Sequence, residues 1–225
     1  MSFDPLKPYP FIKRLFATPI YTDMCSRDNF EIIQTEFQKT YNTLIKKDWF
    51  KQNPTWGSNT HMLSRLDDAD YAVSFNDSII HKFDHKIFAR EVEAHCRKYL
   101  SACGYRHAEY VKMHWRGSWM TLNKKGMYAH THDHGDSDIA GVYYVNTNGE
   151  DGDFQFFSNL KELKSAQGFL EYEQHWQFKP QVGRFILFPG YLDHAVMENR
   201  TDNNRVSVSF NISLIPDYEV PKFKT

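Results

Sequence analysis

The chain has 225 residues, of which 41% are hydrophobic and 16% aromatic, enough to form one folded domain with a buried core. Its formal net charge is −1 and it has no polybasic run, which argues against charge-driven binding to nucleic acid or to an anionic membrane. No segment approaches the length of a membrane-spanning or signal-peptide apolar core, so we expect neither membrane insertion nor secretion. Three cysteines without paired spacing fit a reducing cytoplasm, where we expect the protein to be located.

The N-terminal part contains a short apolar run followed by a helical pattern. LFATPIY, residues 15–21, predicts a strand. From residue 28 to residue 47, apolar side chains recur at intervals of three and four, which predicts an amphipathic helix. Ser26 or Asp28 is available as its N-cap.

A second helix is predicted over residues 78–103, after a polar stretch. Residues 51–77 have little periodicity and predict a loop with one short strand near 61–63. Asp77 can cap the helix, and Gly104 stands where a left-handed residue ends one. The apolar stripe of this helix consists of Phe88, Val92, Cys96, Tyr99 and Cys103.

The second predicted helix also carries three histidines, His81, His85 and His95. His81 and His85 are four residues apart and have the spacing of two metal ligands on one helix face. Because no third ligand lies near them in sequence, we interpret all three as part of a solvated helix face.

The rest of the chain has the character of a β protein. Short runs rich in β-branched and aromatic residues alternate with turn signals, without helical patterns between them. This indicates a sandwich or jelly roll, with the helices buttressing it. We expect one domain over residues 1–225, mostly helical support up to residue 105 and a jelly-roll core over 106–225. The expected strands cover residues 109–115, 118–123, 139–146, 153–157, 175–179, 184–188, 194–198 and 204–214.

Histidines gather in the segment HTHDH. His130, His132 and His134 stand at alternate positions, so in an extended strand their side chains would line one wall. A further histidine, His194, follows the tight element Phe188-Pro189-Gly190 about 60 residues later. Neighbouring ligands on one strand and a third ligand distant in sequence are typical of a metal site that leaves positions open for substrate or water.

The sequence leaves the ligand set open. The preferred set is His132, His134 and His194. His134 with Asp136 would instead give the His-x-Asp part of a two-histidine, one-carboxylate site for Fe(II), and His130 with His132 is a third choice. Asp133 would point to the opposite face.

The last predicted strand, NRVSVSFNISL, alternates apolar and polar residues. If its polar face looks into the barrel, Arg205 and Ser207 can hold a carboxylate through charge-assisted hydrogen bonds and a hydroxyl. His194 precedes Arg205 by eleven residues, enough for one turn between two strands. A metal site and an anion site would then share one cavity.

These motifs resemble those of the Fe(II)- and 2-oxoglutarate-dependent oxygenases. In that superfamily a His-x-Asp/Glu motif and a distal His bind iron, and an Arg about ten residues further on, often within Arg-x-Ser, binds 2-oxoglutarate. The segments HDHGDSDIAGVYYV, GRFILFPGYLDHAV and RVSVSFNI are similar to those of a subfamily from bacteria and phages with the pattern HxHP…SGVYYV and RISISFN. The resemblance covers most of the chain and is weak between residues 45 and 105.

The resemblance implies a double-stranded β-helix, the cupin-like form of the jelly roll, and a site with defined roles. His132, His134 and His194 would bind Fe(II), while Arg205, Ser207 and Tyr144 would hold 2-oxoglutarate. Two positions depart from the pattern: His134 stands where the superfamily has a carboxylate, and Gly135 replaces the subfamily's proline.

The implied activity is that of a dioxygenase that uses O₂ to hydroxylate a substrate and converts 2-oxoglutarate to succinate and CO₂. The substrate would be a small molecule, an amino acid or a protein side chain, and a homodimer is an open alternative to a monomer. Three of the five tryptophans, Trp115, Trp119 and Trp176, are candidates for a substrate wall or for structural burial. As an alternative to a role in 2-oxoglutarate binding, Tyr143 and Tyr144 would be one core and one surface aromatic residue.

Two other interpretations compete with the oxygenase. The spacings around Gly126 and His134, and later around Gly183 and His194, also resemble the two cupin motifs, with Asp138 near the acidic ligand. A cupin isomerase or a 2-oxoglutarate-independent dioxygenase would need no Arg205. A non-catalytic β-sandwich binding protein is the third interpretation.

Overall fold

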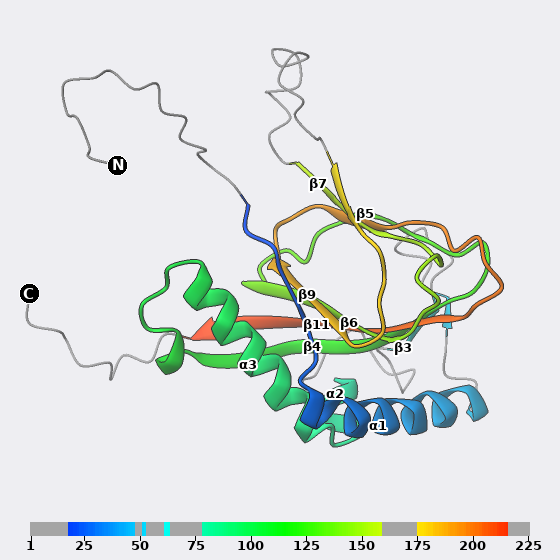
Figure 1. The fold of residues 1–225 in the computed structure, drawn as a ribbon, viewed down its shortest axis with the longest axis horizontal. Helices are drawn as coiled ribbons and strands as arrows, with labels where there is room; N and C mark the ends of the chain where they lie inside the picture. The colour runs from blue at the N-terminus through cyan, green and yellow to red at the C-terminus, as the bar shows by residue number, and fades with distance from the viewer. Residues whose placement is uncertain (1–17, 48–50, 53–60, 64–77, 159–174, 216–225) are drawn as a thin grey trace, which may run out of the picture.

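The computed structural model describes residues 18–47, 51–52, 61–63, 78–158 and 175–215. Two antiparallel β-sheets face each other, and helices α1, α2 and α3 cover the outer face of the larger sheet (Figure 1). The predicted fold class is thereby confirmed: α+β and mainly β, with a double-stranded β-helix buttressed by N-terminal helices.

The larger sheet is antiparallel throughout its described pairings. Its strands lie in the order β1 (Tyr21–Met24), β9 (Arg184–Pro189), β6 (Ile139–Asn146), β11 (Arg205–Ile215), β4 (Lys112–Asn123), β3 (His61–Leu63) and β2 (Lys51–Gln52). The smaller sheet has the order β5 (Ala129–His132), β10 (His194–Val196), β7 (Phe154–Phe157) and β8 (His175–Phe178). Strand β11 lies between β6 and β4 and pairs with both along most of its length.

Most strands lie where the sequence predicts them, with three differences. The runs predicted at 109–115 and 118–123 become one strand, β4, because β11 pairs with it continuously apart from one bulge, and the start of the first run lies instead in a short 3-10 helix, Ala108–Tyr110. Of the strand predicted at 15–21, residues 15–17 lie outside the described part and residues 18–20 are not in a strand, while β1 begins at Tyr21, where its pairing with β9 begins. Strand β5, within the histidine run, was not among the expected strands.

The helix predicted over residues 78–103 is two helices. The helix α2 (Ile79–Lys82) ends in a turn in which Asp84 has a φ of 55°, and α3 (Lys86–Ala102) begins after it. Gly104 has the predicted left-handed conformation, with a φ of +83°. The predicted cap Asp77 lies outside the described residues, and Ser78 occupies the N-cap position of α2.

The first helix, α1 (Arg27–Lys46), agrees with the prediction within one residue at each end. Ser26 is at its N-cap position, but the hydroxyl donates to Glu91 of α3 at 3.1 Å rather than to the helix. Asn29 and the Ser26 backbone N–H donate to the same carboxylate, at 2.6 and 2.7 Å. Glu91 thus joins the start of α1 to α3 from a buried position.

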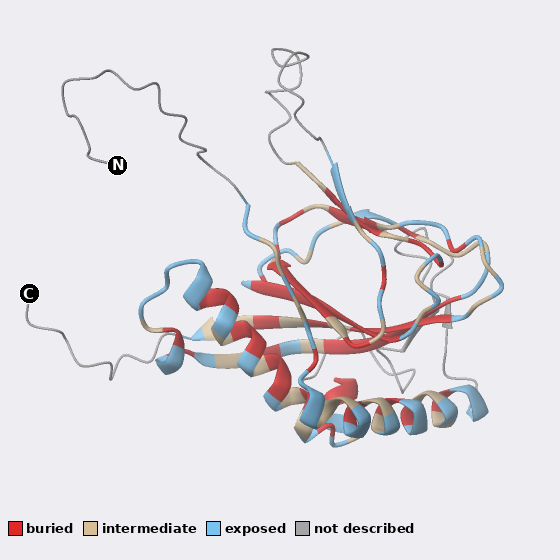
Figure 2. Cartoon of the chain, in the orientation of Figure 1, coloured by how far each residue is buried: buried red, intermediate tan, exposed pale blue. Residues whose placement is uncertain are grey.

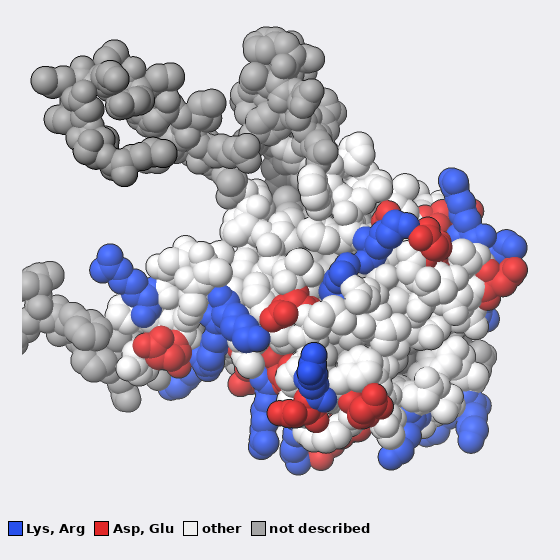
Figure 3. All heavy atoms as spheres, viewed as in Figure 1, with Lys and Arg blue, Asp and Glu red and all other residues white. Residues whose placement is uncertain are grey.

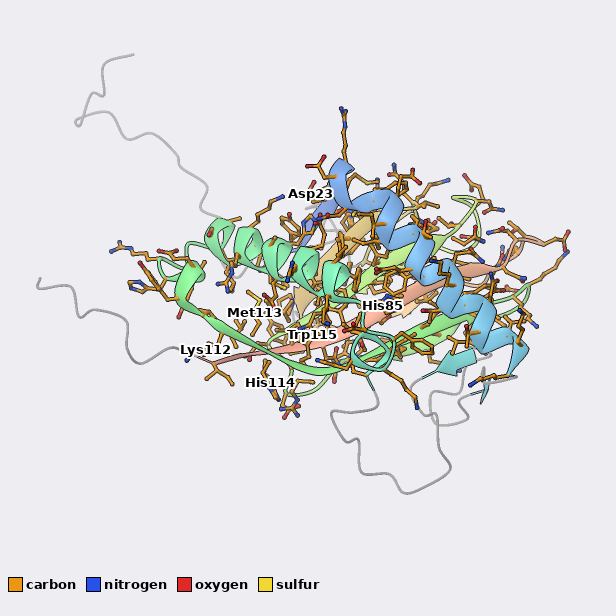
Figure 4. All side chains as sticks on the ribbon, turned by 90° about the horizontal axis from the view of Figure 1, so that it is seen from below. Asp23, His85, Lys112, Met113, His114 and Trp115 are labelled. Carbon is orange, nitrogen blue, oxygen red and sulfur yellow. The ribbon has the colours of Figure 1, made fainter. Side chains whose placement is uncertain are left out.

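The interpretation of the helical histidines as solvated is wrong for two of them. His81 is exposed, but His85 and His95 are only 2% and 1% exposed. The His85 ring lies 3.0 Å from Thr40 Oγ1, and the His95 ring lies 2.8 Å from Tyr21 Oη. Since α1 and β1 cover this face of the helices, these imidazoles pack against side chains rather than water; Figure 4 shows His85 among the helices that lie over the sheet.

The cysteines behave as the sequence predicts in one respect and differently in another. All three are free thiols. Cys25 and Cys96 are buried, but Cys103, expected on the apolar stripe, is exposed because it follows the last residue of α3.

An aromatic layer fills the space between the helices and the larger sheet. Phe88 of α3 is fully buried, and its ring centroid lies 4.7 Å from that of Phe37 on α1 and 5.2 Å from that of Tyr143 on β6. Tyr143 and Tyr144 project from opposite faces of β6 and are both buried, so the alternative of one core and one surface aromatic residue is wrong. Figure 2 shows the buried faces of the helices turned toward the sheet.

The surface carries charges of both signs. Figure 3 shows acidic and basic side chains interspersed on the face viewed. Within the described residues, no helix combines the length and apolar character needed to cross a bilayer.

The aromatic layer predicts a large cost for truncating its central ring. Phe88→Ala should lower the free energy of unfolding by about 3–5 kcal/mol, because it removes a fully buried ring and leaves a cavity. Ile45→Ala on exposed α1 surface is the control, with an expected change within about 0.5 kcal/mol. Urea unfolding of both variants tests this, and a cost below about 1 kcal/mol for Phe88→Ala would contradict it.

Candidate metal centre and adjoining anion pocket

Three imidazoles meet at one end of the smaller sheet. His132 ends β5, and His194 begins β10 directly opposite it in the antiparallel register. His134 follows in the turn after β5. One ring nitrogen from each of the three lies within 4.8 Å of the others, and the ring centroids are 4.3 to 5.4 Å apart.

The local turn, rather than a continuous strand, brings His134 to the cluster. Strand β5 stops at His132, after which the Gly135 N–H donates to Asp133 Oδ1 at 2.8 Å. The His134 N–H donates to the Gly190 carbonyl at 2.8 Å, which ties this turn to the segment before His194. The chain thus curves back so that both histidines face His194.

The other candidate ligands lie outside the cluster. His130 is exposed, and its ring packs against Tyr128 with 5.0 Å between centroids. The Asp136 carboxylate accepts two hydrogen bonds from Arg116, at 2.8 and 3.0 Å, and its side chain is 75% exposed. Asp133 is exposed, as expected from its position opposite the histidines.

Two of the imidazoles are oriented by backbone carbonyls. His132 Nδ1 lies 2.7 Å from the His130 carbonyl oxygen, and His194 Nδ1 lies 2.9 Å from the Leu192 carbonyl oxygen. Because a carbonyl only accepts hydrogen bonds, Nδ1 carries the proton in both rings, and Nε2 presents its lone pair. This is the arrangement that fixes the tautomer of metal-binding histidines.

A side chain, that of Asn211, orients the His134 ring as the backbone carbonyls orient the other two. His134 Nδ1 lies 3.3 Å from the amide of Asn211 on β11, and Asn211 Oδ1 has no partner among the described residues. The two ends of an amide are sterically alike, so a half-turn of the Asn211 amide places Oδ1 where it accepts from Nδ1–H. All three rings then have the same tautomer, with Nε2 available to a cation.

Burial keeps the three imidazoles neutral. Desolvation is the largest cause that lowers each pKa, and it lowers the pKa of His134 to about 4, assisted by the neighbouring His132. Burial lowers the pKa of His194 well below its ordinary value, assisted by the neighbouring His132 and His134. Neutral imidazole is the form that binds a metal ion.

A buried guanidinium, that of Arg205, lines the same pocket. Arg205 is 2% exposed, and its Nη1 donates to the carbonyl oxygens of Gly152 at 2.5 Å and Asp151 at 3.3 Å. Its Nε has no partner among the described residues. Burial lowers the pKa of Arg205, but guanidinium ionises at so high a pH that the group stays charged.

Strand pairing places two hydroxyl groups near this cation. Ser207 follows Arg205 on the same face of β11 and is opposite Tyr144 on β6. Tyr144 Oη is buried without a partner among the described residues, and burial raises the pKa of this phenol to about 12, so it keeps its proton. A guanidinium and O–H donors in an enclosed space form a site for an anion, a carboxylate above all.

One pocket joins the histidine cluster to this anion site. Together with its open mouth it encloses about 540 Å³. Of the three candidate tryptophans, Trp119 lines the pocket, Trp115 is buried in the core against Phe210, and Trp176 is 56% exposed. The pocket lining includes His132, His134, His194, Tyr144, Arg205 and Ser207.

Sequence reasoning missed several residues of this pocket. Thr121 and Asn123 line it with Trp119, at alternate positions of β4, because β4 pairs with β11 in register and presents the same face. Their spacing of two was a usable signal once that pairing was known. Phe154 stacks on His194, with 5.2 Å between ring centroids, and only the pairing of β7 with β10 reveals this.

Residues 117–211 match the family described as "Putative 2OG-Fe(II) oxygenase". This match confirms the family resemblance. That family uses Fe(II), 2-oxoglutarate and O₂. None of the curated proteins matches this sequence closely enough to count as a relative.

Solved structures share the fold at low sequence identity. A prolyl-4-hydroxylase from Pseudomonas putida is 9% identical, with a TM-score of 0.56, over 88% of this chain and 94% of that chain. A Trichoplax adhaerens prolyl hydroxylase in complex with a hypoxia inducible factor peptide is 14% identical, with a TM-score of 0.54, over 86% and 83%. The carbocyclase SnoK from nogalamycin biosynthesis is 11% identical, with a TM-score of 0.57, over 87% and 80%.

The neutral imidazoles predict a pH-dependent stability of the metal-free protein. Because folding lowers their pKa, to about 4 for His134, the unfolded state binds more protons between about pH 6.5 and about pH 4. The stability is complete above pH 6.5 and is lost as the pH falls toward 4. His134→Gln should reduce this loss by on the order of 1 kcal/mol.

The measurement is the free energy of unfolding of the metal-free protein at pH 7 and pH 4.5. His130→Gln, on exposed surface of the same segment, serves as the control and should keep the wild-type loss. If His134→Gln loses as much stability between pH 7 and pH 4.5 as the wild type, then His134 is not held neutral by burial.

Proposed function

We propose that this protein is an Fe(II)- and 2-oxoglutarate-dependent dioxygenase that hydroxylates a small-molecule, amino-acid or protein substrate. The observation that carries the proposal is the presence, in one pocket, of three imidazoles that converge and a buried guanidinium whose Nε has no partner among the described residues. A cupin enzyme would need only the imidazoles, and a binding module would need neither group. A site for a 2-oxo dicarboxylate on a metal ion needs both the imidazoles and the guanidinium.

The histidine cluster fits Fe(II). Imidazole nitrogens suit iron, and His132, His134 and His194 present three of them from one side, which leaves other coordination positions open. His134 takes the position at which the superfamily has a carboxylate. The proposed ligand set is therefore neutral, and a bound Fe(II) keeps its full positive charge toward an anionic chelator.

The anion site fits the far carboxylate of 2-oxoglutarate. Arg205 supplies the charge, and Ser207 and Tyr144 supply hydroxyl donors on the same face of the sheet. Among the described residues, Arg205 Nε and Tyr144 Oη are buried polar groups of this pocket without partners, and a carboxylate would satisfy both. The protein residues thus hold the dicarboxylate by the end that does not react.

When bound, Fe(II), 2-oxoglutarate and O₂ supply an oxidative decarboxylation in which one oxygen atom enters succinate and the other hydroxylates the substrate, with release of CO₂. The chain's own residues keep the components in place. His132 and His194, whose Nδ1–H groups donate to backbone carbonyls, hold their Nε2 atoms toward the metal position. Phe154 and Phe188 pack around His194 at 5.2 and 4.7 Å between ring centroids and exclude water from that side. Catalytic residues beyond the proposed metal ligands are not required by this scheme.

Two of the substrate classes in the proposal, protein and small molecule, have a counterpart among the structures of similar fold. One is described in complex with a peptide fragment, and another is a carbocyclase of nogalamycin biosynthesis. Beside His134 the pocket is lined by Trp119, whose ring centroid lies 5.7 Å from that of His134. A substrate with an apolar or planar group adjacent to the oxidised carbon would fit against the Trp119 ring.

The proposal predicts which residues hold the metal. His194→Ala should lower the affinity for Fe(II), or for Co(II) as an air-stable probe, by more than about 100-fold, since even an outer partner of a ligand contributes about 10- to 100-fold. The same variant should abolish formation of succinate from 2-oxoglutarate. Equilibrium metal titration and a succinate assay measure the two effects.

Two matched variants decide between the ligand sets. His130→Gln and Asp136→Asn remove the alternative ligands and should leave both metal affinity and succinate formation within about twofold of wild type. If Asp136→Asn loses metal as strongly as His194→Ala, the carboxylate is a ligand and the three-histidine set is wrong.

A further inference from the structure

The guanidinium of Arg205 is held by a backbone clamp in the loop between β6 and β7. Its Nη1 donates to the carbonyl oxygens of Asp151 and Gly152, at 3.3 and 2.5 Å, in a position that is fully enclosed. A long arginine side chain would otherwise have several rotamers available. The clamp selects one of them and points the remaining N–H groups into the pocket.

Gly152 is required for this approach. It has a φ of +106°, which side chains other than glycine rarely adopt. A Cβ at this position would overlap the Met197 carbonyl oxygen and would lie 3.1 Å from Arg205 Nη1. Any larger residue must therefore move the loop, and with it the two carbonyl groups that contact the guanidinium.

Asp151 keeps the loop in shape. Its side chain is completely buried and accepts hydrogen bonds from Thr147 Oγ1 at 2.5 Å, from the Asn148 N–H at 3.0 Å and from Asn203 Nδ2 at 2.6 Å. Asn203 lies in the turn that precedes Arg205 on β11. The carboxylate thus ties both loops beside Arg205 to each other.

We infer that the loop 147–153 is a positioning element that fixes the reach of Arg205, so that the pocket selects a dicarboxylate by length. A guanidinium that cannot move donates to the far carboxylate at only one distance from the histidine cluster. Asp151 and Gly152 are positioning residues, since they contact Arg205 and not the proposed cosubstrate. This inference rests on the proposed function and specifies how its cosubstrate is chosen.

The test compares three 2-oxo dicarboxylates that differ by one methylene: oxaloacetate, 2-oxoglutarate and 2-oxoadipate. Calorimetric titration of the Mn(II)-loaded protein under anaerobic conditions gives their Kd values without turnover. In the wild type, 2-oxoglutarate should bind at least about tenfold more tightly than either neighbour, the factor that about 1.4 kcal/mol provides. In Gly152→Ala, the Kd for 2-oxoglutarate should rise about tenfold, and the preference over 2-oxoadipate should fall to about twofold or less.

Thr147→Val provides a milder variant that keeps the shape of the residue and removes two hydrogen bonds within the loop, the one to Asp151 and the one that the Gly149 N–H donates to Thr147 Oγ1. It should raise the Kd for 2-oxoglutarate about threefold and reduce the preference for 2-oxoglutarate over 2-oxoadipate, as Gly152→Ala does. Glu150→Gln is the control and should change neither value, because the side chain of this exposed residue of the same loop pairs with Lys179 and, among the described residues, makes no hydrogen bond or ion pair with Asp151 or Arg205. Mn(II) affinity should be the same in all variants, since the loop contributes none of the three histidines.

The outcomes separate the two proposals. If the wild type binds none of the dicarboxylates, the proposed function itself is wrong. If the wild type prefers 2-oxoglutarate and Thr147→Val keeps the same Kd and the same preference, the loop does not position Arg205, and only this inference is overturned. Thr147→Val decides the matter even if Gly152→Ala does not fold.

Discussion

The alternation of side chains along strand β11 is the constraint on which the rest of this structure depends. In a strand the period is two, so each residue is committed to one face of the sheet. Val206, Val208 and Phe210 face the helices and belong to the apolar core, while Arg205, Ser207 and Ser209 face the pocket. A slip of one residue would bury the arginine among aromatic rings and expose the core to the pocket. The apolar layer against the helices thus fixes the register that aims the polar residues.

The pocket side of the sheet buries a charge, and this has a thermodynamic cost. Removing a guanidinium from water costs several kcal/mol unless it is paired. Two backbone carbonyls compensate part of this cost for Arg205, and its Nε stays without a partner among the described residues. An anion that completes the pairing would therefore bind to the folded protein and stabilise it. The same reasoning applies to the three neutral imidazoles, which are desolvated in advance for a cation.

Local patterns predicted much of this architecture. The period-two pattern of NRVSVSFNISL predicted that Arg205 and Ser207 share a face, and the structure places both in the pocket lining. The apolar residues at intervals of three and four over residues 28–47 predicted α1. The histidine spacing pointed to the cluster, although a turn and not a strand brings His134 to His132.

What the sequence did not predict depends on contacts between distant segments. The burial of His85 and His95 follows from the packing of α1 and β1 over the second helical region, which periodicity within one helix does not reveal. The break at Asp84 likewise arises where the chain turns to bury His85. The clamp on Arg205 consists of backbone carbonyls, for which side-chain identity is a weak guide.

The central claim is that the histidine cluster and Arg205 together bind one 2-oxo dicarboxylate. The most direct measurement is an anaerobic titration of the Fe(II)-loaded protein with 2-oxoglutarate, followed through the weak visible charge-transfer band that such a chelate gives, for the wild type and for Arg205→Ala. We predict a saturable band in the wild type and a cosubstrate requirement more than about tenfold higher in the variant, since a charge-assisted contact is lost. Iron binding without any band, or equal titrations in the two proteins, would contradict the claim.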